Sequence, residues 1–320
     1  MENLNIVILD AKTLGSDISF SLFEKFGSVT VYDVTPSECV EDRINEADVI
    51  IVNKIKLNET NLSSAKRLKL ICVTATGYDN IDIEYCKNNN IGVCNVRGYS
   101  SESVAQTTLS MALSLINNIS EFDDYVKSGK YTASGTQNRV EPVFHEMSTL
   151  TWGIVGLGAI GKKTAELAKA FGCKVVAYKR TPDDDYECVG IDELCKVSDI
   201  ISIHLPLTEE TCELINKDRI TLMKKSAIVI NVARGSVVDE SALCDAVISG
   251  EIGGIGVDVY SIEPMLEDSP YNRVKDLKNV ILTPHMAWAA YEARVRCMDE
   301  ISLNIQTFLD NGIRNRVDMR

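Results

Sequence analysis

Residues 153–166 read "GIVGLGAIGKKTAE" and contain Gly156, Gly158 and Gly161 in the spacing G-x-G-x-x-G. An apolar run leads into the first glycine and a helical pattern follows the third, which predicts a strand, a tight turn and a helix. In such a turn the first glycine allows the bend, the second lets the backbone approach a pyrophosphate, and the third lets helix and strand pack closely. The helix N-terminus stabilises the phosphate charge. The stretch therefore predicts a dinucleotide-binding domain.

Apolar runs of strand length alternate with helical patterns on both sides of this turn. From residue 151 onward, six runs predict strands: "TWGIVG", "KVVAY", "DIISIHL", "SAIVINV", "GGIGVDV" and "NVILTPH". Before it, five runs do so, with a helical pattern over 16–26: "NIVIL", "VTVYD", "VIIVN", "LKLICV" and "IGVCNV". Continuous apolar strands joined by helices indicate parallel sheets covered on both faces. We expect an α/β protein with two doubly wound parallel-sheet domains, a Rossmann dinucleotide domain and a smaller, flavodoxin-like one.

The last helical pattern suggests how the sequence is partitioned between the domains. It runs from about residue 289 to 311, ends at Gly312, and places five apolar side chains on one face: Val295, Met298, Ile301, Ile305 and Phe308. This face needs a surface to pack on, and the first series of strands stops without an obvious final helix. We therefore expect a discontinuous domain of residues 1–99 plus 290–320 and a dinucleotide domain of residues 100–289. The polar stretch 128–139 predicts a loop.

Composition narrows the class of protein. The 320 residues include 33 basic and 46 acidic side chains, and the net charge of −13 opposes nonspecific binding to nucleic acid or anionic membranes. No apolar run reaches the roughly 20 residues of a membrane span, and the N-terminus lacks the features of a signal peptide, so we expect a cytoplasmic protein with a small-molecule partner. The ten cysteines contain no CxxC pair and indicate reduced thiols, and no metal-ligand motif is present.

The stretch "KVVAYKRTP", residues 174–182, departs from the usual dinucleotide pattern. Where such a fold offers an acid to the adenosine ribose, this chain has Lys179 and Arg180. Both can pair with a 2′-phosphate, which favours NADPH slightly over NADH. The alternative is that both are solvated and that one of the following acids turns back to the ribose: Asp183, Asp184 or Asp185.

Three motifs at strand ends supply a possible catalytic group. "NVARGSVVDE", "GVDVYSIEP" and "LTPHMAW" contain Arg234, Glu263 and His285. Because ligands of α/β sheets bind beyond the carboxyl ends of strands, the three side chains could converge. Hydride transfer to a ketone needs a nearby acid, an imidazole can supply the proton, and a neighbouring carboxylate favours its charged form. An arginine can hold the carboxylate of a 2-keto acid. The other two histidines, His145 and His204, lack such a partner in the sequence.

At this point the sequence resembles the D-isomer-specific 2-hydroxyacid dehydrogenase family. The resemblance covers nearly the whole length through the three motifs, the glycine stretch, "VTATGYDNIDIEYCKNNNIGVCNVRGYSSESVAQ" and "SIHLPLTEETCELIN". Within the family, "VNK", "ATGYDNID", "GYSSESVAQ" and "HMAW" are most similar to the glycerate dehydrogenase (hydroxypyruvate reductase) branch.

The resemblance implies a role for each matching residue. Arg234 would bind the substrate, Glu263 would orient its partner, and His285 would be the general acid and base. Four residues of the smaller, substrate-binding domain would line the cleft: Asn53, Lys54, Gly77 and Tyr99. Beside the glycines and the basic pair, seven residues would contact the cofactor, NAD(P): Ala159, Ile160, Pro206, Thr211, Val232, Ala233 and Asp258. Family members are typically homodimers, with the long helix after the first lobe at the interface.

The substrate stays open at this stage. The leading expectation is D-glycerate/hydroxypyruvate or glycolate/glyoxylate. A dehydrogenase of D-lactate, or of D-2-hydroxy acids with a branched side chain, is the alternative, because substrate size depends on side chains lining the cleft. A co-regulator that senses NAD(H) without turnover is an alternative from another class, since a fold does not fix a function.

Overall fold

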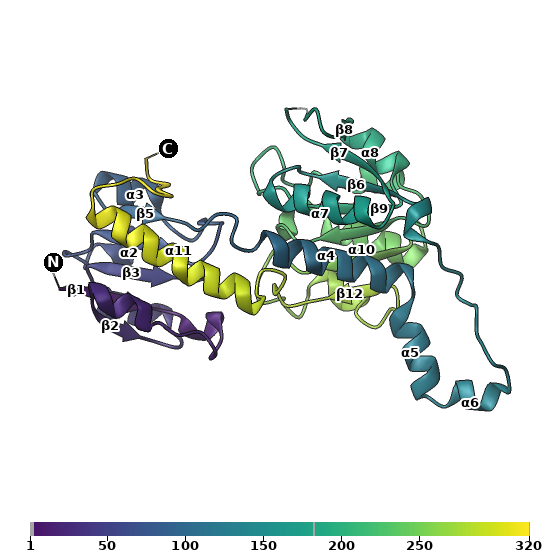
Figure 1. The fold of residues 1–320 in the computed structure, drawn as a ribbon, viewed down its shortest axis with the longest axis horizontal. Coiled ribbons are helices and arrows are strands. Elements are labelled where there is room, and N and C mark those ends of the chain that lie inside the picture. Colours follow the sequence, from purple (N-terminus) through teal and green to yellow (C-terminus); the bar gives the residue numbers. More distant parts are fainter. Residues whose placement is uncertain (1–2, 182, 320) are drawn as a thin grey trace. The chain divides into compact units, whose positions relative to one another are not determined.

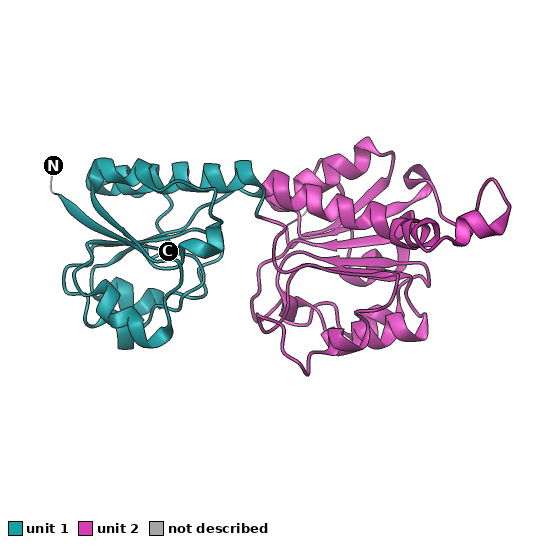
Figure 2. Ribbon diagram, turned by 90° about the horizontal axis from the view of Figure 1, so that it is seen from below, with its two compact units in different colours: residues 1–100, 289–320 teal, residues 101–288 magenta. Residues whose placement is uncertain are grey.

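The computed structural model describes residues 3–181 and 183–319, and the protein forms two compact units (Figures 1 and 2). Unit 1 comprises residues 1–100 and 289–320, and unit 2 comprises residues 101–288. None of the helices in these described ranges combines the length and the apolar character that crossing a membrane requires.

Unit 2 is built on a seven-stranded parallel sheet in the order β12-β11-β10-β9-β6-β7-β8. The strands are β6 (Thr151–Val155), β7 (Lys174–Tyr178), β8 (Glu187–Cys188), β9 (Ile200–Ile203), β10 (Ile228–Asn231), β11 (Gly254–Val257) and β12 (Val280–Leu282). The order reverses between β6 and β9, as in doubly wound dinucleotide folds, and all carboxyl ends lie at one edge. The six expected strands are present. The seventh, β8, was not predicted because two residues are too few to form an apolar pattern.

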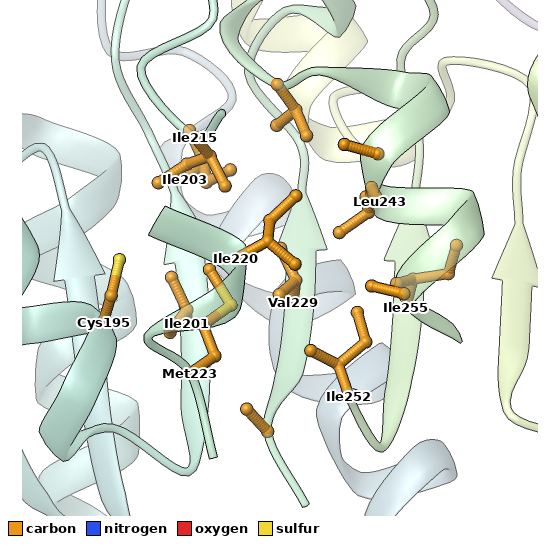
Figure 3. Packing of buried hydrophobic residues seen from close by; sticks show 14 of the residues in the cluster. Cys195, Ile201, Ile203, Ile215, Ile220, Met223, Val229, Leu243, Ile252 and Ile255 are labelled. Atoms are coloured by element: carbon orange, nitrogen blue, oxygen red, sulfur yellow. The ribbon is translucent and has the colours of Figure 1, made fainter. Parts of the chain in front are cut away.

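Successive residues of the central strands enter different cores. Helices α4 (Ser101–Ile116) and α7 (Ala159–Ala170) pack in one core, and α8 (Ile191–Val197), α9 (Lys217–Thr221) and α10 (Glu240–Ser249) pack in the other. In β10, Ile228 and Ile230 join the first core and Val229 joins the second. Figure 3 shows the second core, which includes Ile201, Ile203, Ile220 and Leu243. Burial on both faces explains why these strands are apolar throughout.

Unit 1 holds a five-stranded parallel sheet in the order β2-β1-β3-β4-β5, the order of flavodoxin-like folds. Its strands are β1 (Leu4–Ile8), β2 (Gly27–Val31), β3 (Val49–Val52), β4 (Leu70–Val73) and β5 (Gly92–Cys94). The short helices α1 (Val40–Ile44), α2 (Glu59–Leu62) and α3 (Ile83–Asn88) share one core with β1, β3, β4 and β5. The predicted fold class, two doubly wound parallel sheets, is confirmed.

The last helix, α11 (Tyr291–Leu309), belongs to unit 1 and packs on β4. Met298, Ile301 and Ile305 are buried, whereas Val295 and Phe308, which were expected beside them, are only partly so. Beyond the helix the chain returns to the sheet edge, where the N–H of Val317 donates to the carbonyl of Val93 at 2.9 Å. The C-terminal segment thus covers one face of the unit 1 sheet with α11 and borders the sheet at β5.

Two stretches differ from their predictions. Residues 16–26 do not form an α-helix; only the 3-10 helix η2 (Ser21–Phe26) lies in this stretch, and a second one, η1 (Ala11–Leu14), ends before it. The buried residues of this stretch, Ile18, Phe23 and Phe26, are spaced by five and three, which does not match one helical face. The predicted loop at 128–139 contains the short helix α6 (Lys130–Ser134), which follows α5 (Ile119–Lys127).

Candidate active site

The glycine turn joins β6 to α7 at the carboxyl edge of the unit 2 sheet. Gly156 has a φ of 101°, and a Cβ there would lie 2.9 Å from the carbonyl group of His204. A Cβ on Gly161 would lie only 2.0 Å from the carbonyl oxygen of Gly156, so α7 packs against the turn through a glycine. A Cβ on Gly158, in contrast, would meet no atom within 4 Å. The backbone is therefore tightly packed at Gly156 and Gly161, whereas Gly158 borders open space.

These environments fit the phosphates of a dinucleotide. The backbone at Gly158 borders open space, into which a pyrophosphate can approach closely. Ala159 and Ile160 begin α7, and the first N–H groups of a helix have no partner within it, so they favour an anion at this end. The residues present thus suit the pyrophosphate of a dinucleotide.

The turn after β10 carries Val232, Ala233 and Arg234. The fully buried amide of Asn231 braces this turn: its Oδ1 accepts from the N–H of Ala233 at 3.1 Å, and its Nδ2 donates to the carbonyl oxygen of Arg234 at 2.9 Å. Sequence reasoning missed Asn231, although it stands within the quoted "NVARGSV" motif. An asparagine at the end of an otherwise apolar strand is the signal that could have identified it.

The loop after β11 carries Glu263 and meets the Arg234 turn. A Cβ on the next residue, Gly235, would lie 2.1 Å from the backbone of Tyr260, so the two loops touch through a glycine. Glu263 Oε1 accepts from the N–H of Tyr260 at 3.2 Å, and Glu263 Oε2 lies 2.7 Å from Nδ1 of His285. The side chains of His285 and Glu263 keep 23% and 30% of their surface exposed, so a small molecule can reach the pair.

Asp258 holds the segment that presents His285. Its buried Oδ1 accepts from Oγ1 of Thr283 at 2.6 Å and from the N–H of Met286 at 2.8 Å, while Oδ2 accepts from the N–H of Ala287 at 2.9 Å. His285 has a φ of 52°, a left-handed conformation that costs a non-glycine residue about 1–2 kcal/mol. These hydrogen bonds stabilise that conformation. The family resemblance implied only a contact of Asp258 with the cofactor, and this positioning role was missed.

The other two histidines are placed differently. Nε2 of His204 lies 2.9 Å from Oγ of Ser202, which also accepts from the indole of Trp152, and the buried Nδ1 has no partner among the described residues. Burial lowers the pKa of His204 to about 3, so this ring is neutral near pH 7 and offers no imidazolium proton for an acid catalyst. His145 lies exposed in the segment before β6.

The two basic residues after β7, Lys179 and Arg180, have different environments. Lys179 Nζ lies 3.0 Å from Oδ2 of Asp183, and the same oxygen lies 2.8 Å from Nζ of Lys162 on α7. Hydrogen bonds from Lys162 and Lys179 lower the pKa of Asp183 to about 2. Arg180 is nearly fully exposed and lies 3.8 Å from Glu210. Lys179 is thus paired within the chain, and Arg180 is solvated.

Pro206 and Thr211 lie in one loop after β9. Oγ1 of Thr211 donates to the carbonyl oxygen of Pro206 at 2.7 Å and accepts from the N–H of Thr208 at the same distance. The loop is therefore closed by its own hydrogen bonds. The expected contact of these two residues with the cofactor stays a prediction.

In unit 1, the residues expected at the substrate lie on loops that follow strands. The carboxylate of Asp10 is buried and accepts from the N–H groups of Asn53, at 2.9 Å, and Lys54, at 2.7 Å. Burial raises the pKa of Asp10, although these N–H groups act against the shift. The amide of Asn53 is itself buried and donates to Thr13, whereas the side chain of Lys54 is exposed. Of the predicted pair, Lys54 is the residue that can meet a ligand directly.

Gly77 lies in the loop after β4. Nδ2 of Asn80, three residues later, donates to the carbonyl oxygen of Ile55 at 2.9 Å and so joins this loop to the one that carries Lys54. Tyr99 is 5% exposed in unit 1, and its hydroxyl lies 3.5 Å from the carbonyl oxygen of Thr74. Its expected place at the substrate stays a prediction.

Within residues 3–181 and 183–319, no group of three His, Cys, Asp or Glu side chains is arranged to hold a metal ion. The ten cysteines are unpaired thiols, and most of them are buried.

Residues 109–287 match the sequence family described as D-isomer specific 2-hydroxyacid dehydrogenase, NAD binding domain. The chain belongs to this family. Like other D-isomer specific 2-hydroxyacid dehydrogenases, it is a nicotinamide-dependent oxidoreductase of two α/β domains. It is 33% identical over 324 residues to a hydroxypyruvate reductase of Blautia hydrogenotrophica, a match that covers 98% of this chain and 100% of the relative.

Two solved structures extend the comparison to ligands. A D-lactate dehydrogenase from Aquifex aeolicus, complexed with NAD and lactic acid, is 33% identical, has a TM-score of 0.85 and covers 98% of this chain and 99% of its own. An acyclic imino acid reductase in complex with NADPH and D-Arg is 30% identical, has a TM-score of 0.87 and covers 98% of this chain and 100% of its own. Both forms of the nicotinamide cofactor thus occur among similar dehydrogenase folds.

Proposed function

We propose that this enzyme reduces hydroxypyruvate to D-glycerate and glyoxylate to glycolate, reversibly, with NAD(P)H as the hydride donor. The observation that carries the proposal is the pair of His285 and Glu263, whose Nδ1 and Oε2 lie 2.7 Å apart. The pair stands at the same edge of the unit 2 sheet as the glycine turn. The similarity to the hydroxypyruvate reductase of Blautia hydrogenotrophica supports the choice of substrate.

His285 is proposed to give the proton. Reduction turns the carbonyl oxygen of the substrate into a hydroxyl, which needs a proton, while the bound nicotinamide supplies the hydride. Because Nδ1 faces Glu263, we assign proton delivery to Nε2. Glu263 orients the ring and balances the positive charge that the ring carries before transfer. The N–H of Tyr260 fixes the other oxygen of Glu263.

Arg234 is proposed to hold the substrate. Its guanidinium can donate two parallel hydrogen bonds to the carboxylate of a 2-keto acid and can polarise the carbonyl. Asn231 and Gly235 set its position, the first by bracing the turn and the second by letting the turn contact the Glu263 loop. For the cofactor we propose the glycine turn at the pyrophosphate, Val232 and Ala233 at the nicotinamide, and Asp258 at its carboxamide.

Unit 1 is proposed to bind the remaining part of the substrate and to serve as the substrate-binding domain. The exposed ammonium of Lys54 can bind the hydroxyl or carboxylate of hydroxypyruvate, and backbone N–H groups around Gly77 can bind the carboxylate. Asp10 acts through the backbone of Asn53 and Lys54, which it holds in place. A hydroxylated substrate fits a polar loop of this kind better than a branched apolar one.

A D-lactate dehydrogenase activity is the second candidate. It is favoured by the similarity to the Aquifex aeolicus enzyme, whose structure contains lactic acid. Pyruvate differs from hydroxypyruvate by one hydroxyl group. A site that hydrogen-bonds this group would reject pyruvate strongly, because the polar partner would be left unpaired.

The test is a comparison of kcat/KM on hydroxypyruvate, glyoxylate, pyruvate and 2-ketoisocaproate, with the product analysed for its enantiomer. We expect hydroxypyruvate to give the highest value and D-glycerate to be the product. A higher value for pyruvate would support the second candidate. If none of the four acids leads to oxidation of NADH or NADPH, the proposal is refuted, and a sensor without turnover is favoured.

We also propose that the enzyme is a cytoplasmic homodimer. Unpaired cysteines fit a reducing compartment. The segment after α4 exposes apolar side chains that a second copy could cover: Ile119, Val126, Val140, Val143 and Phe144. Light scattering is expected to give twice the mass of the chain, and the mass of a single chain would contradict the dimer.

A further inference from the structure

Asp183 lies at the point where the adenosine ribose of a dinucleotide is expected. Its Oδ2 is within 3.0 Å of Nζ of Lys179, the first residue after β7, and within 2.8 Å of Nζ of Lys162, in the second turn of α7. In this fold the ribose hydroxyls are bound at the end of the second strand, next to the helix that follows the glycine turn. The carboxylate therefore lies between the two elements that border the ribose.

The loop that carries Asp183 is fastened to α7. Lys169 Nζ lies 3.9 Å from the centre of the Tyr186 ring and 3.5 Å from the carbonyl oxygen of Asp185. The side chain of Asp183 is 10% exposed, and its N–H lies 3.4 Å from Sγ of Cys188 on β8. The position of Asp183 is thus built into the loop between β7 and β8.

The orientation of the carboxylate suits hydroxyl donors. Both ammonium groups bind Oδ2, whereas Oδ1 has one long contact, 3.4 Å, with the N–H of Asp185. An ionised carboxylate only accepts hydrogen bonds, and ribose hydroxyls can donate them. Oδ1 has the capacity to accept from the 2′-hydroxyl of the adenosine ribose.

The same carboxylate disfavours a 2′-phosphate, which is negatively charged and has no hydroxyl to donate at this position. The phosphate would have to displace Asp183 from both Lys162 and Lys179, or lie beside an ionised carboxylate. Asp184 and Asp185 follow in the same loop and are exposed. Arg180 is nearly fully solvated, and an ion pair of that kind contributes little. The acidic side chains of this loop therefore oppose the approach of a phosphate.

We propose that Asp183 binds the adenosine ribose in place of the missing acid at Lys179 and makes the enzyme selective for NAD(H) over NADP(H). Lys162 and Lys179 then position this carboxylate instead of binding phosphate. The inference deepens the proposed function and rests on it only for the binding of a nicotinamide dinucleotide. It reverses the preference for NADPH that Lys179 and Arg180 indicate in the sequence.

The test is the dissociation constants of NADH and NADPH, measured by fluorescence titration of the whole chain without substrate. We expect the wild type to bind NADH at least about tenfold more tightly, since hydrogen bonds to a charged acceptor are strong. Asp183→Ser should weaken NADH by about tenfold and strengthen NADPH, because both lysines become available to a phosphate. Asp184→Ser removes the same charge from the exposed neighbour and should leave the ratio unchanged.

Lys179→Ala distinguishes the two possible roles of the lysine. If Lys179 positions Asp183, this variant binds NADPH no more weakly than the wild type; if it binds the phosphate, NADPH affinity falls. Tighter binding of NADPH by the wild type, equal ratios for the two Asp→Ser variants, or binding of neither dinucleotide would each overturn the inference. Because no substrate is present, these results are independent of whether the enzyme turns over a 2-keto acid.

Discussion

Replacing Gly158 by Ala separates the stability of the fold from the binding of the dinucleotide. A Cβ at Gly158 would meet no atom within 4 Å, and the φ of −81° suits any residue, so the turn can accept the methyl group without strain. We expect the free energy of unfolding to change by less than about 1 kcal/mol, the range of Gly→Ala changes at compatible sites. For a unit of this size that is a shift in Tm of at most about 4 °C.

Cofactor binding should respond quite differently. The new methyl group would occupy the space through which a pyrophosphate approaches the backbone, and the phosphate would lose about one hydrogen bond from an N–H group of the turn. Hydrogen bonds to charged groups contribute about 1.5–3 kcal/mol each, so the dissociation constant of NADH should rise by about 10- to 100-fold. Fluorescence titration with NADH and thermal unfolding of the same preparation measure the two effects.

Two further glycines provide the comparison. Gly190 precedes α8 as Gly158 precedes α7, and a Cβ there also meets no atom within 4 Å, so Gly190→Ala should alter neither NADH binding nor Tm beyond the same range. Gly161→Ala places a Cβ 2.0 Å from the carbonyl oxygen of Gly156 and should lower Tm by about 6–16 °C, from a cost of about 3–4 kcal/mol. If Gly158→Ala binds NADH as tightly as Gly190→Ala, the glycine turn does not hold the pyrophosphate and our reasoning is wrong.

Three other predictions concern groups that act through their neighbours. Asp258→Asn leaves at least one of the donors from Thr283, Met286 and Ala287 without an acceptor. The free energy of unfolding should therefore fall by about 1–3 kcal/mol, and kcat should fall because His285 loses its support. Unchanged Tm and kcat would contradict this positioning role. Asp10→Ala releases the backbone of Asn53 and Lys54, so the KM for the 2-keto acid should rise while the dissociation constant of NADH stays the same. An unchanged KM in steady-state kinetics would refute this prediction. Burial lowers the pKa of His204 to about 3, so the folded state resists protonation and stability is lost as pH falls from about 6.5 towards 3. His204→Gln should lose less stability over this range. Denaturant unfolding at pH 7 and pH 4.5 measures the loss, and equal losses in the two proteins would contradict the assignment.

The sheets could be predicted from the sequence because their central strands are buried on both faces. Ile228, Val229 and Ile230 form an uninterrupted apolar run, and the structure shows that they enter two cores in turn. The strand β8 could not be predicted, because its two residues are held by pairing with β7 rather than by an apolar pattern of their own. Residues 16–26 were misassigned because the spacing of Ile18, Phe23 and Phe26 only roughly resembles a helical face.

The candidate site was predictable where residues follow strands at one sheet edge. Glu263 and His285 lie in different loops, and the structure pairs them, as the placement of their motifs after neighbouring strands suggests. The supporting acids were not predictable in the same way. Asp10 and Asp258 act through backbone N–H groups that lie 28 to 44 residues away in the sequence, and the pairing of Asp183 with Lys162 depends on how a loop folds over a helix. Such contacts leave no local pattern in the sequence.

The central claim, that His285 is the acid of a D-2-hydroxyacid dehydrogenase, is tested most directly by comparing His285→Gln with His145→Gln. His145 is exposed and lies before β6, so its replacement controls for the loss of a histidine. The measurement is kcat for the reduction of hydroxypyruvate, together with the dissociation constant of NADH for each variant. We predict that His285→Gln lowers kcat by about 10²- to 10⁴-fold with NADH binding intact, while His145→Gln has the wild-type rate. Equal turnover by the two variants would contradict the account.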